Sequence, residues 1–255
     1  MKIGEVRLWK LTRRMAREAM SAGHFKGAII PTGSTEQHNE YLAMEHDTAS
    51  ALHIAYHAAI DLYPHVLVTP PVPVGLSEHW MDFPGSLTLK PETFIAVVYD
   101  ICDSLKRHGI EHILIVNGHA GNGPLRHEMA DFNEKLGIDI EFCCYWEAYS
   151  KEYMDRIVGS GKGVAHAAEF ETSFGYAAFP ENAHWEEVDY EKADLKIKSE
   201  SYAKEDPAAF AESRDLAMAH KGRVMINEAI NWVAEKMATK MNLQGIKNRD
   251  QGDSF

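Results

Sequence analysis

The chain has 255 residues and carries 26 lysines and arginines against 38 aspartates and glutamates, a formal charge of −12 at pH 7. A surface of this sign repels nucleic acid and anionic membranes, which excludes both as main partners. Apolar residues make up 45% of the chain and charged residues 25%, the balance of a globular protein.

The cysteine content and the N-terminus indicate a cytoplasmic protein. The cysteines are odd in number and two are adjacent (Cys102, Cys143, Cys144), which is typical of free thiols rather than a disulfide. The N-terminal segment lacks the long apolar run of a signal peptide, and no stretch approaches the ~20 apolar residues of a membrane helix. We therefore expect a cytoplasmic chain with no membrane-spanning segment.

Short apolar runs alternate with helical patterns along the chain. The expected strands are residues 27–31, 65–69, 112–116 and 138–145. The expected helices are residues 48–63, with Asp47 as a candidate N-cap, then 91–108, 124–136 and 223–241. This order predicts an α/β fold, a three-layer α/β/α sandwich with a mostly parallel central sheet. No internal repeat or linker divides residues 1–255, so we expect one domain with a polar tail over residues 244–255.

Polar residues with metal-binding chemistry follow two of the expected strands. Glu36 and His38 come after the first strand, and an alternating spacing places both side chains on one face of an extended chain. Asp47 lies nine residues further on, and His119 stands in a glycine-rich turn after the third strand. Singly, Asp47 reads as a helix cap, His119 as a turn residue and Glu36 as a solvated charge. Together, at strand ends where ligands collect, they favour a zinc or manganese site.

The same segments resemble the motifs of the creatininase family. The matching segments span residues 27–180 and are Gly33-Ser34-Thr35-Glu36-Gln37-His38, the later Asp47, Phe83-Pro84-Gly85-Ser86, Asn117-Gly118-His119 and Glu171-Thr172-Ser173. The resemblance implies an α/β/α hydrolase with two divalent ions, Zn or Mn or both. It also implies a homo-oligomer, in several members a hexamer.

The resemblance further implies roles for individual residues. Glu36 and His38 would each bind one ion, Asp47 would bridge the ions, and His119 would join Glu36. Creatininase has a glutamate where this chain has Gly121. We therefore expect Glu169 to supply the missing carboxylate beside His38.

Three neighbouring residues receive other roles. His166 matches a family histidine thought to carry protons, and on a first helical turn it would share a face with Glu169. Glu171 would then point elsewhere on that helix, toward a supporting or subunit-contact role. His79, in the Ser77-Glu78-His79 segment, is a candidate for contact with a small-molecule substrate.

The implied reaction is the attack of metal-bound hydroxide on the carbonyl of a small cyclic or formyl amide, as in creatinine amidohydrolase. Creatinine itself is not expected, because Asn39-Glu40-Tyr41-Leu42-Ala43 departs from the family pattern and Lys162 stands nearest the position of a pocket-closing tryptophan. One alternative is a hydrolase that opens a cyclic diketone from inositol or carbohydrate catabolism. Another is a metal-binding subunit without enzymatic activity.

Overall fold

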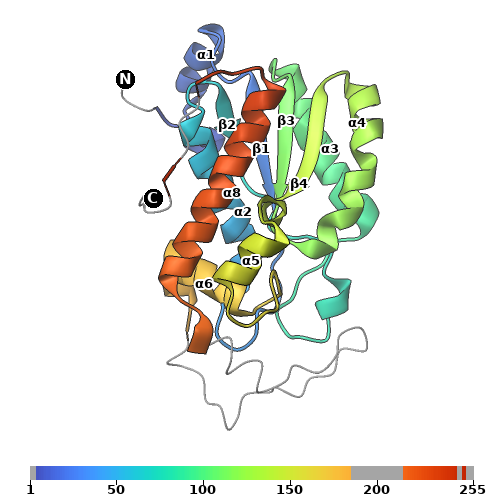
Figure 1. Ribbon diagram of the computed structural model, residues 1–255. Coiled ribbons are helices and arrows are strands. Elements are labelled where there is room, and N and C mark those ends of the chain that lie inside the picture. Colours follow the sequence, from blue (N-terminus) through green and yellow to red (C-terminus); the bar gives the residue numbers. More distant parts are fainter. Residues whose placement is uncertain (1–3, 185–214, 246–248, 251–255) are drawn as a thin grey trace.

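The computed structural model describes residues 4–184, 215–245 and 249–250, and its centre is a four-stranded parallel sheet (Figure 1). The strands are β1 (Gly27–Thr32), β2 (Val66–Val68), β3 (His112–Asn117) and β4 (Asp139–Cys144), in the spatial order β2-β1-β3-β4. Thr32 pairs with Asn117 and Asn117 with Cys144, so three strands end level with one another. The parallel sheet expected from the sequence is confirmed.

Helices cover both faces of the sheet. On one face lie α2 (His46–Asp61) and α8 (Ala219–Lys240), and on the other lie α3 (Pro91–Arg107) and α4 (Met129–Leu136) (Figure 1). The remaining α-helices described are α1 (Arg13–Ser21), α5 (Lys151–Ile157) and α6 (Glu169–Ala178), which packs against α8. Short 3₁₀ segments are Leu8–Lys10, Glu78–Trp80, Ala120–Glu128, Tyr145–Ala148 and Pro180–Asn182. Among the helices described, none is long and apolar enough to cross a membrane.

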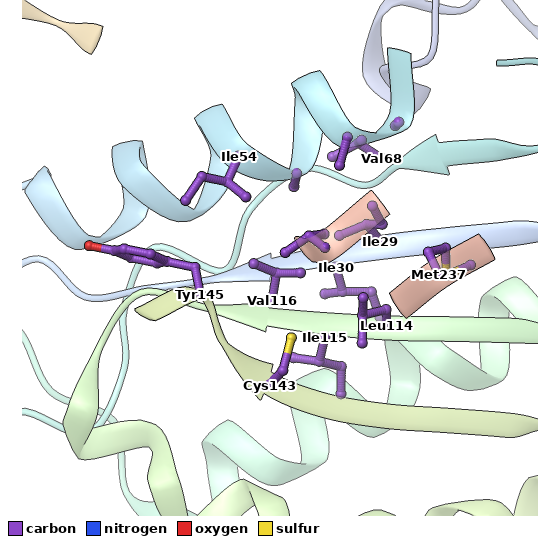
Figure 2. Packing of buried hydrophobic residues seen from close by; sticks show 14 of the residues in the cluster. Ile29, Ile30, Ile54, Val68, Leu114, Ile115, Val116, Cys143, Tyr145 and Met237 are labelled. Carbon is purple, nitrogen blue, oxygen red and sulfur yellow. The ribbon is translucent and has the colours of Figure 1, made fainter. Parts of the chain in front are cut away.

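The core is formed where these helices meet the sheet. β1, β2 and almost all of β3 are buried, as expected for parallel strands that are covered on both faces. In Figure 2, Ile54 of α2 and Met237 of α8 approach Ile29, Ile30 and the neighbouring strand residues. Four buried alanines of α2 let the helix lie close to the sheet (Ala51, Ala55, Ala58, Ala59). The α/β/α sandwich expected from the sequence is therefore the observed architecture.

Two expected elements differ in detail. The helix expected over residues 124–136 is a 3₁₀ segment up to Glu128 and an α-helix only from Met129, because two glycines and Pro124 in that segment disfavour a regular α-helix. Part of the expected polar tail is anchored. Arg249 forms two hydrogen bonds with Asp61 and pairs through its backbone with Asn231. The rest of the tail, apart from residues 244–245 and Asp250, falls outside the part of the chain described.

The topology leaves a crevice at the carboxyl ends of β1 and β3. From β1 the chain passes through α2 to β2 on one side, and from β3 it passes through α4 to β4 on the other. The loops after β1 and β3 therefore diverge, and ligands of open α/β sheets bind at such points.

Candidate metal centre

Four buried ionisable side chains meet in this crevice. Glu36 and His38 lie on the loop after β1, Asp47 on the first turn of α2, and His119 on the loop after β3. Each is at most 3% exposed. Burying charged groups at this depth is costly unless they pair with one another or with an ion.

Asp47 lies between the two histidines. Its Oδ1 atom is 3.0 Å from Nε2 of His38, and its Oδ2 atom is 3.0 Å from Nδ1 of His119. Each carboxylate oxygen therefore faces a different imidazole, which is the arrangement of a carboxylate that serves two ions.

Backbone carbonyls orient both imidazoles. Nδ1–H of His38 donates to the carbonyl oxygen of Glu36 at 3.1 Å, and Nε2–H of His119 donates to the carbonyl oxygen of Leu76 at 3.1 Å. In the neutral rings, the nitrogens that face Asp47 therefore carry lone pairs. Metal-binding histidines are commonly held in this way by a hydrogen bond from the other ring nitrogen.

One further carboxylate stands beside each histidine. Oε1 of Glu36 is 3.2 Å from Nδ1 of His119, and Oε2 of Glu171 is 3.7 Å from Nε2 of His38. Ser77 donates from Oγ to the other oxygen of Glu36 at 2.6 Å. The donors thus form two sets that share Asp47, one with Glu36 and His119 and one with His38 and Glu171.

The donor chemistry fits divalent zinc or manganese. Carboxylate oxygens and imidazole nitrogens are the usual ligands of both ions. Two ligands ~2.1 Å from one ion lie ~3.0–3.4 Å apart in octahedral or tetrahedral coordination, near the contacts between these donors. Within the described structure, while the His119 ring is neutral with its proton on Nε2, the buried Oδ2 atom of Asp47 accepts no hydrogen bond. A cation is the partner that such an array of lone pairs lacks.

The negative charges of the clustered carboxylates also favour the binding of positive charge. Burial disfavours protonation of His38 and His119, but the adjacent carboxylates outweigh burial and raise the pKa of His38 to about 9 and that of His119 to about 10. Burial would raise the pKa of Asp47, yet the two imidazoles hold it well below its ordinary value. Burial also raises the pKa of Glu171, to about 7. Protons on the histidines occupy the positions that cations would take.

Glu169, expected as a ligand, lies outside this cluster. Its carboxylate accepts hydrogen bonds from the backbone of Gly159 and Ser160 at 3.0 and 2.8 Å, and it pairs with Lys221 of α8. The carboxylate beside His38 belongs to Glu171, two residues later. We therefore replace Glu169 by Glu171 in the candidate ligand set.

The backbone before α6 explains this correction. Ala167 has a φ of 46° and Ala168 is extended, so α6 begins only at Glu169. His166 is thus not on the helix, and the expected shared face of His166 and Glu169 does not exist. A signal that pointed to Glu171 was present in the Glu-Thr-Ser motif, whose first residue it is.

The structure also explains why position 121 is a glycine. A Cβ atom at this position would lie 2.3 Å from both Nε2 of His119 and the carbonyl oxygen of Leu76, within the hydrogen bond that orients His119. In this geometry position 121 cannot carry a glutamate, and the second carboxylate has to come from another element.

The cluster opens into a cavity of about 180 Å³. Its wall includes the two other histidines expected at the site, His79 and His166, together with Trp80, Trp146 and Val164. The His79 ring is parallel to that of His119 with centroids 5.8 Å apart, and the His166 ring stacks on Trp80 at 4.8 Å. The structure thus brings together every expected site residue except Glu169. The aromatic wall residues and Ser77 were not predicted from the sequence.

This fold and site define a metal-binding α/β/α protein, and comparison with known proteins identifies its family. The family model for creatininase, described as creatinine amidohydrolase, matches residues 10–237. The chain therefore belongs to the creatininase family.

Curated relatives differ in what their names describe. A mycofactocin precursor peptide peptidase of Mycobacterium ulcerans is 29% identical over 57% of this chain and 55% of its own length. A creatinine amidohydrolase of Pseudomonas putida is 25% identical over 60% and 64%, and a 3-dehydro-scyllo-inosose hydrolase of Thermotoga maritima is 28% identical over 62% and 52%. The chain thus aligns with about half to two thirds of each relative.

Solved structures share the fold. A crystal structure of creatinine amidohydrolase (creatininase) superposes with a TM-score of 0.76 at 21% identity, covering 94% of this chain and 99% of the other. Other matching creatininase structures are described as a Zn-Zn type and as an Mn form.

Proposed function

We propose that this protein is a hydrolase whose active site holds two divalent metal ions, zinc or manganese. Glu36 and His119 would hold one ion, His38 and Glu171 the other, and Asp47 both. The observation that carries the proposal is the contact of the two Asp47 oxygens with two different, pre-oriented imidazoles at 3.0 Å each. Bound divalent cations would lower the pKa of water and polarise a substrate carbonyl.

His166 is suited to move a proton at the mouth of this site. Its Nε2 atom lies 3.0 Å from the carbonyl oxygen of Gln37, while Nδ1 lies 3.8 Å from Glu36 and 4.0 Å from Glu171. Burial lowers the pKa of His166 well below its ordinary value, so the ring is neutral near pH 7. With Nε2–H donated to Gln37, Nδ1 can accept a proton from the site and deliver it to a leaving group.

The cavity favours a small substrate without negative charge. Its volume of about 180 Å³ is below the ~300–1,000 Å³ of pockets for drug-sized ligands. Tryptophan, valine and alanine side chains form much of its wall, and none of the described lining residues is a lysine or arginine. We therefore propose a small cyclic or formyl amide as substrate, with His79 at the substrate side of the site.

The opening of a small cyclic diketone is the second candidate reaction. The similarity to a 3-dehydro-scyllo-inosose hydrolase supports it, and the same donors could activate either carbonyl. The description of the family as creatinine amidohydrolase and the position of His166 beside the candidate ligands both support an enzyme over a metal-binding subunit without activity.

Metal removal and restoration test the proposed function. The purified protein is stripped with chelator, reloaded with Zn²⁺ or Mn²⁺, and assayed against cyclic amides, formamides and cyclic diketones. We expect hydrolysis of one class that disappears with the metal and returns with it. Hydrolysis that is undiminished in fully stripped protein would contradict the proposal, and cleavage of the diketones alone would select the second candidate.

We further propose that the protein acts as a homo-oligomer in the cytoplasm. The resemblance to the family supports the oligomer, and the free, buried cysteines support a reducing compartment. Sedimentation equilibrium of the purified protein would measure the number of subunits, with a hexamer as the family-based expectation.

A further inference from the structure

Glu169 has no place among the candidate metal ligands, yet its carboxylate is fully buried next to the site. It accepts one backbone hydrogen bond on each oxygen, from Gly159 and from Ser160. These two residues begin the segment that leads to His166. A buried carboxylate with two backbone donors is a strong anchor, since hydrogen bonds to charged groups exceed neutral ones in strength.

Lys221 completes this anchor from α8. Its ammonium group pairs with Oε1 of Glu169 and donates to the carbonyl oxygen of Leu216 at 3.0 Å. The lysine side chain is only 16% exposed. Three donors thus converge on one buried carboxylate, and loss of Lys221 would remove its cationic side-chain partner.

Glu171 and the loop after β1 hold the other end of the same segment. The backbone nitrogen of Ala167 donates to Glu171, and its carbonyl oxygen accepts from Asn39 and Tyr41. Two carboxylates from the first turn of α6 thus hold opposite ends of residues 159–167, and only the carboxylate of Glu171 also reaches the candidate metal ligands.

The middle of the segment depends on its two ends. Gly161 and Gly163 have φ values of 69° and 62°, in the left-handed region that glycine adopts without strain. The hydrogen bonds from Lys162 to Ser160 and from Ala168 to Ala165 are both 3.4 Å long, near the limit for such bonds. The residues that follow the glycines line the cavity, namely Val164, Ala165 and His166.

We propose that Glu169 and Lys221 form a positioning pair that does not bind metal. The pair holds residues 159–166 against the cavity and so fixes His166 over the candidate metal ligands. The proposal rests on the proposed function for its effect on rate, but its structural part does not. A displacement of about 1 Å in a catalytic group can reduce a rate ~100-fold, so a distant anchor can control turnover.

Glu169→Gln and Lys221→Met test the pair. Both variants should keep the wild-type metal content, measured by mass spectrometry of the elements. The amides of Gly159 and Ser160 should exchange with deuterium at least ~10-fold faster, because their acceptor is weakened or displaced. The ¹⁵N signals of the His166 ring should shift, and kcat should fall ~10- to 100-fold.

Two further variants serve as controls for these measurements. Lys236→Met removes a lysine of the same helix that pairs with the half-exposed Glu141, and it should change none of these quantities. Glu171→Gln should instead lose metal. Lys221→Met keeps Glu169 in place and serves if Glu169→Gln does not fold.

Three outcomes would overturn the proposal. Loss of a metal ion from Glu169→Gln would return Glu169 to the ligand set. Unchanged His166 ring signals in both variants would show that the pair does not position this residue, even if no substrate has been found. Unchanged kcat despite faster amide exchange would show that the position of residues 159–166 does not control turnover. Absence of hydrolysis by the wild type would count against the proposed function, while exchange and ring signals would still decide the positional claim.

Discussion

Glu169 and Glu171 are two residues apart on the first turn of α6, yet their carboxylates belong to two different structures. Oε2 of Glu171 lies 3.7 Å from Nε2 of His38, whereas Glu169 binds the backbone of Ser160 at 2.8 Å and pairs with Lys221. Positions i and i+2 of a helix are ~200° apart around its axis, so the two side chains cannot face the same ion. The two carboxylates therefore have different partners, a candidate metal ligand for Glu171 and a loop backbone with Lys221 for Glu169.

Metal binding should release protons at neutral pH. Without metal, neighbouring carboxylates raise the pKa of His38 to about 9 and of His119 to about 10, so both rings are protonated at pH 7. Metal ligation needs the bare nitrogens, and we expect release of roughly two protons and an affinity that rises with pH up to about 9. Calorimetric titrations in buffers of different ionisation enthalpy measure the number released. A metal affinity independent of pH between 6 and 9 would be inconsistent with these histidines as ligands.

Ser77→Ala should weaken the binding of one of the two proposed ions selectively. The Ser77 hydroxyl donates to Glu36 at 2.6 Å and lies 3.3 Å from Nε2 of His119, so it supports the donors of one set only. Loss of such a supporting hydrogen bond should lower the affinity of that ion ~10- to 100-fold and leave the other unchanged. Competition titrations with a chromophoric chelator resolve the two affinities. Ser104→Ala removes an exposed helix serine and is the control, and equal weakening of both ions would refute the selective role.

Gly222→Ala should destabilise the packing of α6 on α8. An added Cβ atom would lie 1.9 Å from the carbonyl oxygen of Ser173, so the helices must separate. Alanine gains ~1 kcal/mol of helix propensity over glycine, but overpacking typically costs 1–3 kcal/mol or more, and we expect a net loss. Urea unfolding gives the change in free energy. Gly123→Ala, where no atom lies within 4 Å of the added Cβ, is the control.

Arg249→Met should lower the free energy of unfolding by about 1.5–3 kcal/mol, because it removes two hydrogen bonds between charged groups and leaves Asp61 alone at the end of α2. The two side chains are 14% and 19% exposed, so solvent screens the pair only partly. Arg107→Met, whose partner Asp103 is exposed, should cost less than ~1 kcal/mol in the same denaturant titration. Equal effects of the two substitutions would argue against an anchored tail.

Much of the fold could be predicted from the sequence because its signals are local. Apolar runs at strand spacing, Pro91 at a helix start and Gly137 at a helix end mark their elements without tertiary information. The four strands and their parallel arrangement follow from these signals. The boundary at Met129 was missed because apolar residues continue at near-helical spacing through the preceding 3₁₀ segment, despite its glycines and Pro124.

The site was predictable where motif and geometry coincide. Glu36, His38, Asp47 and His119 each follow or begin an element, and the topology alone brings those positions into one crevice. Glu169 was misplaced because the left-handed backbone at Ala167 delays the start of α6, and this conformation has no signature in a non-glycine residue. Trp80 and Trp146 come from separate connecting segments and reach the cavity only through tertiary packing.

The metal content of three proteins tests the central claim most directly. The wild type, Glu171→Gln and Glu169→Gln are loaded with excess Zn²⁺, freed of unbound metal and analysed for zinc per chain. We predict about two ions in the wild type and in Glu169→Gln, but about one in Glu171→Gln, because only Glu171 stands beside His38. Two ions in Glu171→Gln together with one in Glu169→Gln would contradict the ligand set.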